Sequence, residues 1–326
     1  MTTIPSLPPL KLSARLHTRV WGGRRLADYG KRLLSSEPYG ESWEVHDSAL
    51  IDGGPYDGRT LGDLLAVYGA ALVGEGFNPA EGFPLLVKLI DAQDWLSIQV
   101  HPDDEQARRL EGDPRGKTEA WIILEATPGA RLVIGVHPGT TPQALAAAIR
   151  QETLESLLVY AEARPDDVLY MPAGTIHAIG PGLMIYEVQQ SSDITYRLYD
   201  WGRMGLDGQP RPLHIDKAIQ VANLNSLPTL ARFDAEEDAL VVQGPYFCTR
   251  HWVLRDEHRT QYTAGRFQAL TCLDGSLMLE GLGQAFSLAR GDSALIPANL
   301  PEYTLSGAGR LLVSEALRPA QRSTEG

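Results

Sequence analysis

Short apolar runs bounded by glycine, proline and polar residues dominate the chain and predict many β-strands. Such runs lie at residues 83–90, 95–100, 120–124, 131–134, 167–171 and 183–188, and six or more follow residue 238. Apolar residues at helical spacing are fewer and predict helices over about 60–72, 103–111, 141–160 and 214–224. In the third helix, Thr141 is a candidate N-cap, Pro142 suits the first turn, and an apolar stripe runs from Leu145 to Leu158. We therefore expect a mainly β fold with a few short helices.

A weak internal repeat divides the strands into two groups. Residues 167–177 align with residues 292–302, and each copy reads as a strand, a proline turn at Pro172 or Pro297, and a returning strand. Two tandem β-barrels are the natural interpretation. The turn-rich stretch near 223–232 places the boundary, so we predict a catalytic barrel over 1–228, which carries the helices, and a smaller barrel over 229–326.

Composition and charge exclude several classes of protein. The 326 residues are 43% hydrophobic, which is enough for a large core, and no apolar run is long enough to cross a membrane. A net charge of −12 without a Lys/Arg run argues against nucleic acid as a partner. The two cysteines form no metal-binding pair, and the N-terminus lacks the apolar segment of a signal peptide, so we expect a cytoplasmic protein that binds no membrane.

Residues that can bind a metal gather at predicted strand ends. Gln99 and His101 share one face of a strand that ends at Pro102, Glu119 follows a glycine turn, and His177 follows a tight turn. Two imidazoles, one carboxylate and one amide oxygen can form a tetrahedral or five-coordinate zinc site that leaves a position for water or substrate.

A set of motifs resembles the type I mannose-6-phosphate isomerases, in their short bacterial form. Pro172-x-Gly-x-x-His177 matches the second metal motif of the cupin barrels, and the other motifs occur in the family's order. They are Val20-Trp-Gly-Gly23, Gly40-Glu-Ser-Trp-Glu44, Gln99-Val-His-Pro102, Gly116-Lys-Thr-Glu119, Gly174-Thr-Ile-His-Ala178, Ser192-Asp-Ile-Thr-Tyr-Arg197 and Leu213-His-Ile-Asp-Lys-Ala218. These motifs cover roughly residues 15–220.

The resemblance implies tandem cupin-type jelly-roll barrels and one zinc ion per chain. It implies a zinc-dependent aldose–ketose isomerase that interconverts mannose 6-phosphate and fructose 6-phosphate through an enediol or enediolate. The implied ligands are Gln99, His101, Glu119 and His177. Glu302 stands where the second repeat would need a histidine, so we expect the second barrel to be metal-free.

The same resemblance suggests catalytic and substrate-binding residues. The implied catalytic residues are Arg197, Lys117, Asp193 and Glu187. A sugar phosphate bound to an acidic protein needs local cations, and the candidates are Lys88, Lys117, Arg197 and Arg203. Lys117, Asp193, Glu187 and a ligand-bound water all stay open as the catalytic base, and the oligomeric state and the direction of flux are undetermined.

Three other functions fit part of the pattern. Two histidines and a glutamate also form the facial triad of non-haem iron oxygenases, although Gln99 as a fourth ligand argues against that class. A cupin isomerase with another sugar specificity is the second, and a non-catalytic sugar-binding cupin is the third. Metal content and turnover of mannose 6-phosphate separate these possibilities.

Overall fold

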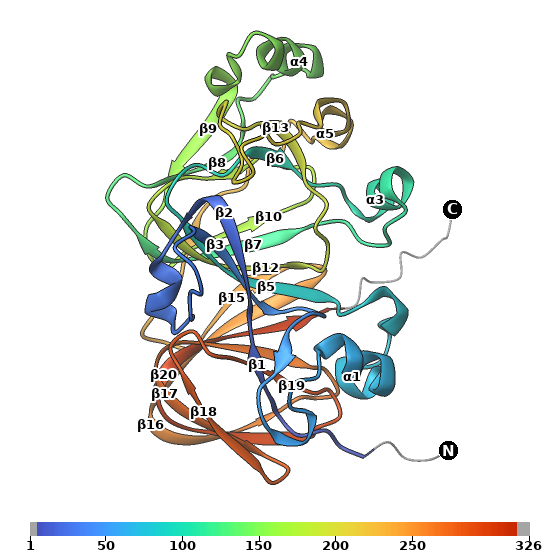
Figure 1. Ribbon diagram of the computed structural model, residues 1–326, viewed down its shortest axis with the longest axis vertical. Coiled ribbons are helices and arrows are strands. Elements are labelled where there is room, and N and C mark those ends of the chain that lie inside the picture. Colours follow the sequence, from blue (N-terminus) through green and yellow to red (C-terminus); the bar gives the residue numbers. More distant parts are fainter. Residues whose placement is uncertain (1–4, 318–326) are drawn as a thin grey trace.

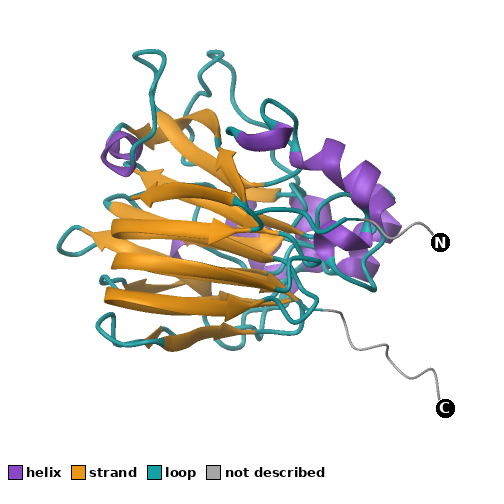
Figure 2. Ribbon diagram, turned by 90° about the horizontal axis from the view of Figure 1, so that it is seen from below, coloured by secondary structure: helices purple, strands orange, loops and turns teal. Residues whose placement is uncertain are grey.

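The computed structural model describes residues 5–317, and the ends of the two predicted barrels at 1–4 and 318–326 lie outside the described residues. Strands build most of the molecule, with two large antiparallel sheets lying one above the other in Figure 1. Most of the helices gather beside one end of the strands (Figure 2). The expected mainly β, cupin-type fold is confirmed, although the sheets do not close into continuous barrels.

A seven-stranded sheet crosses the middle of the molecule in Figure 1. Its order is β14 (Ala231–Arg232), β10 (Asp167–Met171), β7 (Glu119–Ala126), β12 (Leu183–Gln190), β5 (Leu85–Ala92), β3 (Tyr39–Val45) and β2 (Arg15–Gly23). Two small sheets cover it: β11 (Ala178–Ile179), β8 (Arg131–Val136) and β9 (Leu158–Glu162) form one, and β13 (Tyr196–Tyr199) and β6 (Ile98–Val100) form the other.

An eight-stranded sheet forms the lower part of the molecule. Its order is β15 (Ala239–Gln243), β16 (Phe247–Tyr262), β20 (Glu302–Ala316), β17 (Gln268–Gly281), β19 (Ser293–Ile296), β1 (Leu10–Ser13) and β4 (Leu50–Ile51), with β18 (Gln284–Ala289) paired to β17. The N-terminal strand β1 therefore completes the C-terminal sheet, and β14 pairs with β10 across the predicted boundary at 228. The division into two domains at that residue stays a prediction.

The central strand β12 is buried along its whole length, and its two faces serve different cores. Ile185 packs into an interior cluster that also contains Trp121 and Leu169. On the opposite face, Tyr186 lies in the core between the two sheets, and its hydroxyl lies 2.8 Å from Ser314 Oγ of β20. Because side chains alternate along a strand, Glu187 shares the interior face with Ile185.

Three helices begin where their capping residues predict, but the helix predicted over 60–72 is divided in two, because the backbone at Gly69 is not helical, with φ 47°. The helices are α1 (Leu61–Tyr68), α2 (Ala70–Val73), α3 (Asp104–Glu111), α4 (Pro142–Arg150) and α5 (Ile215–Val221), with 3-10 segments at Arg25–Tyr29, Gly54–Tyr56, Pro79–Glu81 and Leu154–Leu157. Thr60 and Asp103 each accept a hydrogen bond from the third residue of α1 and α3, in capping boxes, and Thr141 caps α4.

The predicted helix over 141–160 is wrong in its second half. Helix α4 ends at Arg150, Glu152 adopts a left-handed backbone with φ 58°, and Leu158 begins β9. The apolar stripe continues across this break because both segments bury their leucines against the same core: Leu145, Leu154 and Leu158 belong to one cluster. Because these leucines are all buried, the sequence shows an apolar stripe at helical spacing over 145–158, although the backbone is helical only as far as Arg150.

Both copies of the internal repeat have the predicted form. Strands β10 and β19 end immediately before Pro172 and Pro297, and the returning segments lead to β11 and β20. The first strands of the two copies lie in different large sheets: β10 belongs to the seven-stranded sheet and β19 to the eight-stranded one.

Candidate active site

Three strand ends bring His101, Glu119 and His177 into one buried cluster. The side chains of all three are 1% exposed, and their ligand atoms all lie within 4.8 Å of one another. Backbone hydrogen bonds fix this convergence, since Gln99 N donates to His177 O at 3.0 Å and His177 N donates to Gln99 O at 2.9 Å. Gly174 completes the turn with φ 86°, a conformation that favours glycine.

Hydrogen bonds to backbone carbonyls orient both imidazoles toward Glu119. The Nδ1 atom of His101 lies 2.8 Å from Ile194 O, and the Nδ1 atom of His177 lies 2.9 Å from Thr175 O. Each Nδ1 therefore carries the proton, which leaves an Nε2 lone pair free for a metal. Burial lowers the pKa of His177 to about 4 and that of His101 well below its usual range, so both rings are neutral at pH 7.

Glu119 is a buried carboxylate without a hydrogen-bond partner. Its Oε1 lies 3.2 Å from His177 Nε2, its Oε2 lies 3.6 Å from His101 Nε2, and neither oxygen accepts a hydrogen bond from a described residue. Burial raises the pKa of this carboxyl to about 7, with a further increase from the charge of Glu187. A buried carboxylate facing two imidazole lone pairs is the donor set of a cation site.

The distances within the cluster fit a metal ion. Gln99 extends toward both rings, with its amide 3.5 Å from His101 Nε2 and 3.3 Å from His177 Nε2. Four ligands about 2.1 Å from a tetrahedral zinc ion lie about 3.4 Å apart, close to these separations. Gln99 Nε2 faces the rings and Oε1 accepts from Ser97 Oγ at 3.2 Å, so metal binding through oxygen requires the amide to turn over.

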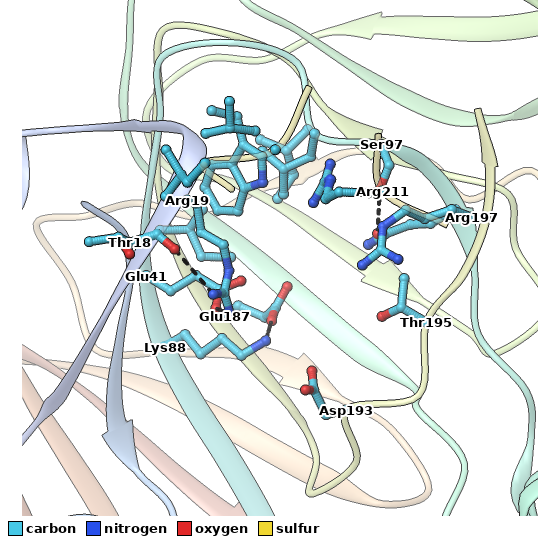
Figure 3. Close-up of a pocket in the computed structure, with 18 of the residues that line it drawn as sticks. Thr18, Arg19, Glu41, Lys88, Ser97, Glu187, Asp193, Thr195, Arg197 and Arg211 are labelled. Atoms are coloured by element: carbon cyan, nitrogen blue, oxygen red, sulfur yellow. Dashed lines mark hydrogen bonds and ion pairs between the residues drawn. The ribbon is translucent and has the colours of Figure 1, made fainter. Parts of the chain in front are cut away.

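A cavity of about 630 Å³ opens beside this cluster. Gln99 and Lys117 belong to its lining, and Lys117 Nζ lies 3.4 Å from Glu119 Oε2. The other predicted residues that line it are Lys88, Glu187, Asp193 and Arg197 (Figure 3). A volume of this size is in the usual range for a small-molecule site.

Lys88 and Glu187 form a buried ion pair on the cavity wall. They lie opposite each other on β5 and β12, and Lys88 Nζ donates to Glu187 Oε1 at 2.9 Å. Trp121 Nε1 donates to the other oxygen of Glu187 at 2.9 Å. Burial alone would raise the pKa of Glu187, but the charges of Lys88 and Lys117 lower it overall. Both oxygens of this carboxylate are therefore already engaged.

The structure does not bring Arg203 into the cavity, contrary to the sequence prediction. Its guanidinium is bonded to Asp94 at 3.1 Å and to Asp200 at 3.0 Å, and it is absent from the cavity lining. Two arginines outside the predicted set line the cavity instead, Arg19 and Arg211. Strand periodicity could have identified Arg19, which shares a face of β2 with Trp21, whereas Arg211 lies in a loop that carries no such signal.

Arg19 and Glu41 form the wall opposite Arg197 and Arg211 (Figure 3). Arg19 Nη2 donates to Glu41 Oε2 at 2.7 Å, and Trp43 Nε1 donates to the same oxygen at 3.0 Å. Burial opposes ionisation of Glu41, but the charges of Lys88 and Arg19 lower its pKa to about 2. Glu41 therefore remains a carboxylate and neutralises Arg19.

Comparisons with known proteins show which family the chain resembles. The model of the phosphomannose isomerase type I catalytic domain matches residues 10–120, and that of the mannose-6-phosphate isomerase cupin domain matches residues 237–316. The chain is 33% identical to the mannose-6-phosphate isomerase of Streptococcus mutans and 34% identical to ManA of Bacillus subtilis, covering 94% of this chain and 98% of each relative.

Solved structures show the same relationship. The crystal structure of the Bacillus subtilis mannose 6-phosphate isomerase superposes with a TM-score of 0.85 at 32% identity, over 94% of this chain and 99% of that one. Phosphomannose isomerase of Salmonella typhimurium shares the fold, with a TM-score of 0.73 at 19% identity over 96% of this chain and 100% of that one.

Proposed function

This chain belongs to the type I mannose-6-phosphate isomerase family, and we propose that it interconverts mannose 6-phosphate and fructose 6-phosphate. One observation carries the proposal beyond the family assignment. A buried His₂Glu cluster with Gln99 beside it adjoins a cavity whose lining includes Lys117 and Arg197. A cation site next to positively charged side chains suits a substrate with a hydroxyl–carbonyl pair at one end and a phosphate at the other.

We propose zinc as the resident metal, held by Gln99, His101, Glu119 and His177. Two neutral imidazoles and a carboxylate are a common donor set of catalytic zinc sites, and the amide oxygen is a hard fourth donor. When bound, the ion supplies Lewis-acid stabilisation of negative charge on the sugar's oxygens. The two oxygens of Glu119 support this assignment, since neither accepts a hydrogen bond from a described residue and both face the imidazole Nε2 atoms.

The reaction moves a proton between C2 and C1 of the open-chain sugar through an enediol or enediolate. Removing the proton next to the carbonyl places negative charge on oxygen, which nearby cations stabilise. Arg197 lies directly across from Gln99 in the β13–β6 pairing, which brings it beside the proposed metal ligands. Lys117 adds a second charge beside Glu119. We assign Arg197 and Lys117 to the stabilisation of this oxyanion.

Asp193 is the carboxylate best placed to take the proton. Glu187 is occupied by Lys88 and Trp121, and its lowered pKa makes it a weaker base. Asp193 lines the cavity, and among the described residues its side chain has no hydrogen bond or ion pair. We therefore propose Asp193 as the base and Lys88–Glu187 as a neutral pair that shapes the cavity wall.

Turnover of three related sugars tests the function. The zinc-loaded protein should convert mannose 6-phosphate to fructose 6-phosphate, and it should act far more slowly on unphosphorylated mannose and on glucose 6-phosphate. Preference for glucose 6-phosphate would indicate a cupin isomerase of another specificity, and binding without turnover would indicate a sugar-binding protein. Iron with oxygen consumption would indicate the oxygenase alternative.

The cellular setting is also a proposal. A sugar phosphate is a metabolite of the cell interior, so we propose a cytoplasmic location. Within residues 5–317, no helix is long and apolar enough to cross a membrane.

A further inference from the structure

Two arginines from opposite arms of one loop converge on a single carboxylate, that of Asp200. The loop joins β13 to α5. Arg211 donates to both oxygens of Asp200, from Nε at 2.7 Å and from Nη2 at 2.5 Å, and Arg203 Nη2 donates to Oδ1 at 3.0 Å. The Asp200 side chain is 7% exposed, so this contact is shielded from water.

The backbone folds back on itself to make this contact. Trp201 and Gly202 have φ of 59° and 65°, and Trp201 is held in that unfavourable conformation by a hydrogen bond from its Nε1 to Leu96 O at 2.8 Å. A bridge between Met204 and Pro210 then closes a hairpin. Asp200 thus joins the two arms at the base of this hairpin.

The two arginines differ in what else they contact. Arg203 is bonded to Asp94 on a neighbouring loop and lies outside the cavity lining. Arg211 lines the cavity, together with Gly205, Leu206 and Asp207 at the hairpin tip. Its Nη1 forms no hydrogen bond with a described residue. The bidentate contact therefore fixes the plane of the Arg211 guanidinium and leaves part of it available to a ligand.

Arg211 lies near a second guanidinium, that of Arg197, which is not paired with a carboxylate. The side chain of Arg197 forms no hydrogen bond or ion pair with another described residue, and its Nε is buried without a partner. Burial, and then the positive charge of Arg211, lower the pKa of Arg197, although the charges of Asp200 and Asp193 oppose this shift. Figure 3 shows the two arginines on the same side of the cavity. Two guanidinium groups on one side of the cavity favour a negatively charged substrate there.

We propose that Asp200 is a positioning residue that holds Arg211 at the cavity wall, where Arg211 binds the phosphate group of the substrate. The proposal rests on the proposed function, since it places the 6-phosphate at the Arg211 side of the cavity. Arg197 pairs with Gln99 on the neighbouring strand, and we place the C1–C2 end of the sugar at these two residues, toward the metal ligands.

The substitution Asp200→Asn tests the proposal. Asparagine has nearly the same shape but offers one acceptor and no charge, so it releases one of the two bonds to Arg211. The KM for mannose 6-phosphate should rise about tenfold, with kcat changed less than about threefold, because a phosphate contact acts equally in the ground and transition states. The Kd for inorganic phosphate, measured by calorimetry on the zinc-loaded protein, should rise by a similar factor.

Asp94→Asn is the matched control. The Asp94 side chain is 60% exposed, and it accepts hydrogen bonds from Arg203 Nη1 and from the backbone N of Trp95 but none from Arg211. Its substitution therefore removes an aspartate from the same cluster and leaves the Asp200–Arg211 contact in place. The KM and the phosphate Kd of this variant should equal those of the unchanged protein. Arg211→Lys, which leaves the Asp200–Arg203 contact in place, should reproduce the rise in both constants if Asp200→Asn fails to fold.

The outcomes separate this proposal from the proposed function. If the unchanged protein turns over mannose 6-phosphate while Asp200→Asn and Arg211→Lys keep its KM and phosphate Kd, the phosphate lies elsewhere and the inference is wrong. If the unchanged protein does not turn over mannose 6-phosphate, the function fails, and the phosphate Kd of the same variants still decides whether Arg211 binds an anion. A fall in kcat without a rise in KM would also overturn the inference.

Discussion

Arg197 lines the cavity, and its side chain forms no hydrogen bond or ion pair with another described residue, which makes it the most informative residue to replace. Arg197→Lys keeps the charge but loses the planar pair of donors that matches two oxygens. If Arg197 stabilises charge that appears only in the transition state, kcat and kcat/KM should fall together, by about 100-fold or more.

Zinc content serves as the control for this variant, since no ligand is lost, and it should equal that of the unchanged protein. A rise in KM with kcat nearly unchanged would instead place Arg197 on the phosphate. Unaltered kinetic constants would remove Arg197 from the active site.

The protonation state of Glu119 gives a pH-dependent prediction. With its pKa raised to about 7, this carboxyl is about 90% protonated at pH 6 in the metal-free protein, whereas His177 with a pKa near 4 is already neutral. Zinc binding at pH 6 should therefore release about one proton, and affinity should increase as the pH rises toward 7. Calorimetry in two buffers with different ionisation enthalpies measures this number. Release of two or more protons would mean that the histidines are charged before the metal binds.

Individual site residues differ in how far the sequence could predict them. His101, Glu119 and His177 follow strand ends with Gly or Pro nearby, and the structure brings them together as expected. Arg203 was chosen for its charge alone, and two aspartates hold it outside the cavity. Arg211 could not be chosen, because its position depends on a loop whose path is fixed by Asp200, a contact that no local pattern reveals.

Among the elements, the turn before β7 determines where Glu119 lies. A Cβ at Gly116 would lie 2.4–2.5 Å from backbone atoms of Asp103 and Pro102, directly after His101. Gly116→Ala should therefore push apart the strand ends that carry two metal ligands, and it should lower both zinc content and kcat.

Gly112→Ala is the comparison in the same loop. Its Cβ would meet nothing within 4 Å, and its φ of 73° costs alanine about 1 kcal/mol, so a small loss of thermal stability with normal zinc content is expected. Metal analysis and thermal unfolding distinguish the two variants. Equal zinc content in both variants would show that the metal site does not depend on the close packing of Gly116 against the backbone of Pro102 and Asp103.

The sequence predicts the bounds of a helix or strand best where a residue at its end, such as an N-cap or a proline, determines the backbone conformation there. The helix starts at Thr60, Asp103 and Thr141 follow from local capping, and strand β10 begins and ends where expected. The end of α4 was missed because burial of Leu154 and Leu158 continues in a different backbone conformation. Strand partners such as β1 with β19 depend on contacts between residues almost 300 positions apart, which periodicity does not encode.

At the scale of the whole molecule, a buried polar network joins the two large sheets. Glu44 of β3 is 1% exposed and accepts hydrogen bonds from Lys31 Nζ at 2.7 Å and from Ser293 Oγ of β19 at 2.9 Å. Glu44→Gln would leave Lys31 without its counter-charge, and it should destabilise the protein by about 3 kcal/mol in denaturant unfolding.

The exposed pair Glu162–Arg164 provides the control, and Glu162→Gln should change the free energy of unfolding by less than about 1 kcal/mol. Neither residue lines the cavity, so kcat should stay near its normal value in both variants. Similar free energies of unfolding for the two variants would show that the contact between the two large sheets does not depend on the Glu44 hydrogen bonds.

The central claim is that a metal held by Gln99, His101, Glu119 and His177 enables isomerisation of mannose 6-phosphate beside it. Its most direct test is the rate of fructose 6-phosphate formation by one protein sample before chelation, after chelation, and after zinc is returned, with folding followed by circular dichroism. The large cores do not include these ligands, so the chain should stay folded throughout. We predict that turnover disappears with the metal and returns with about one zinc per chain. Full turnover by the folded, metal-free chain would contradict the account.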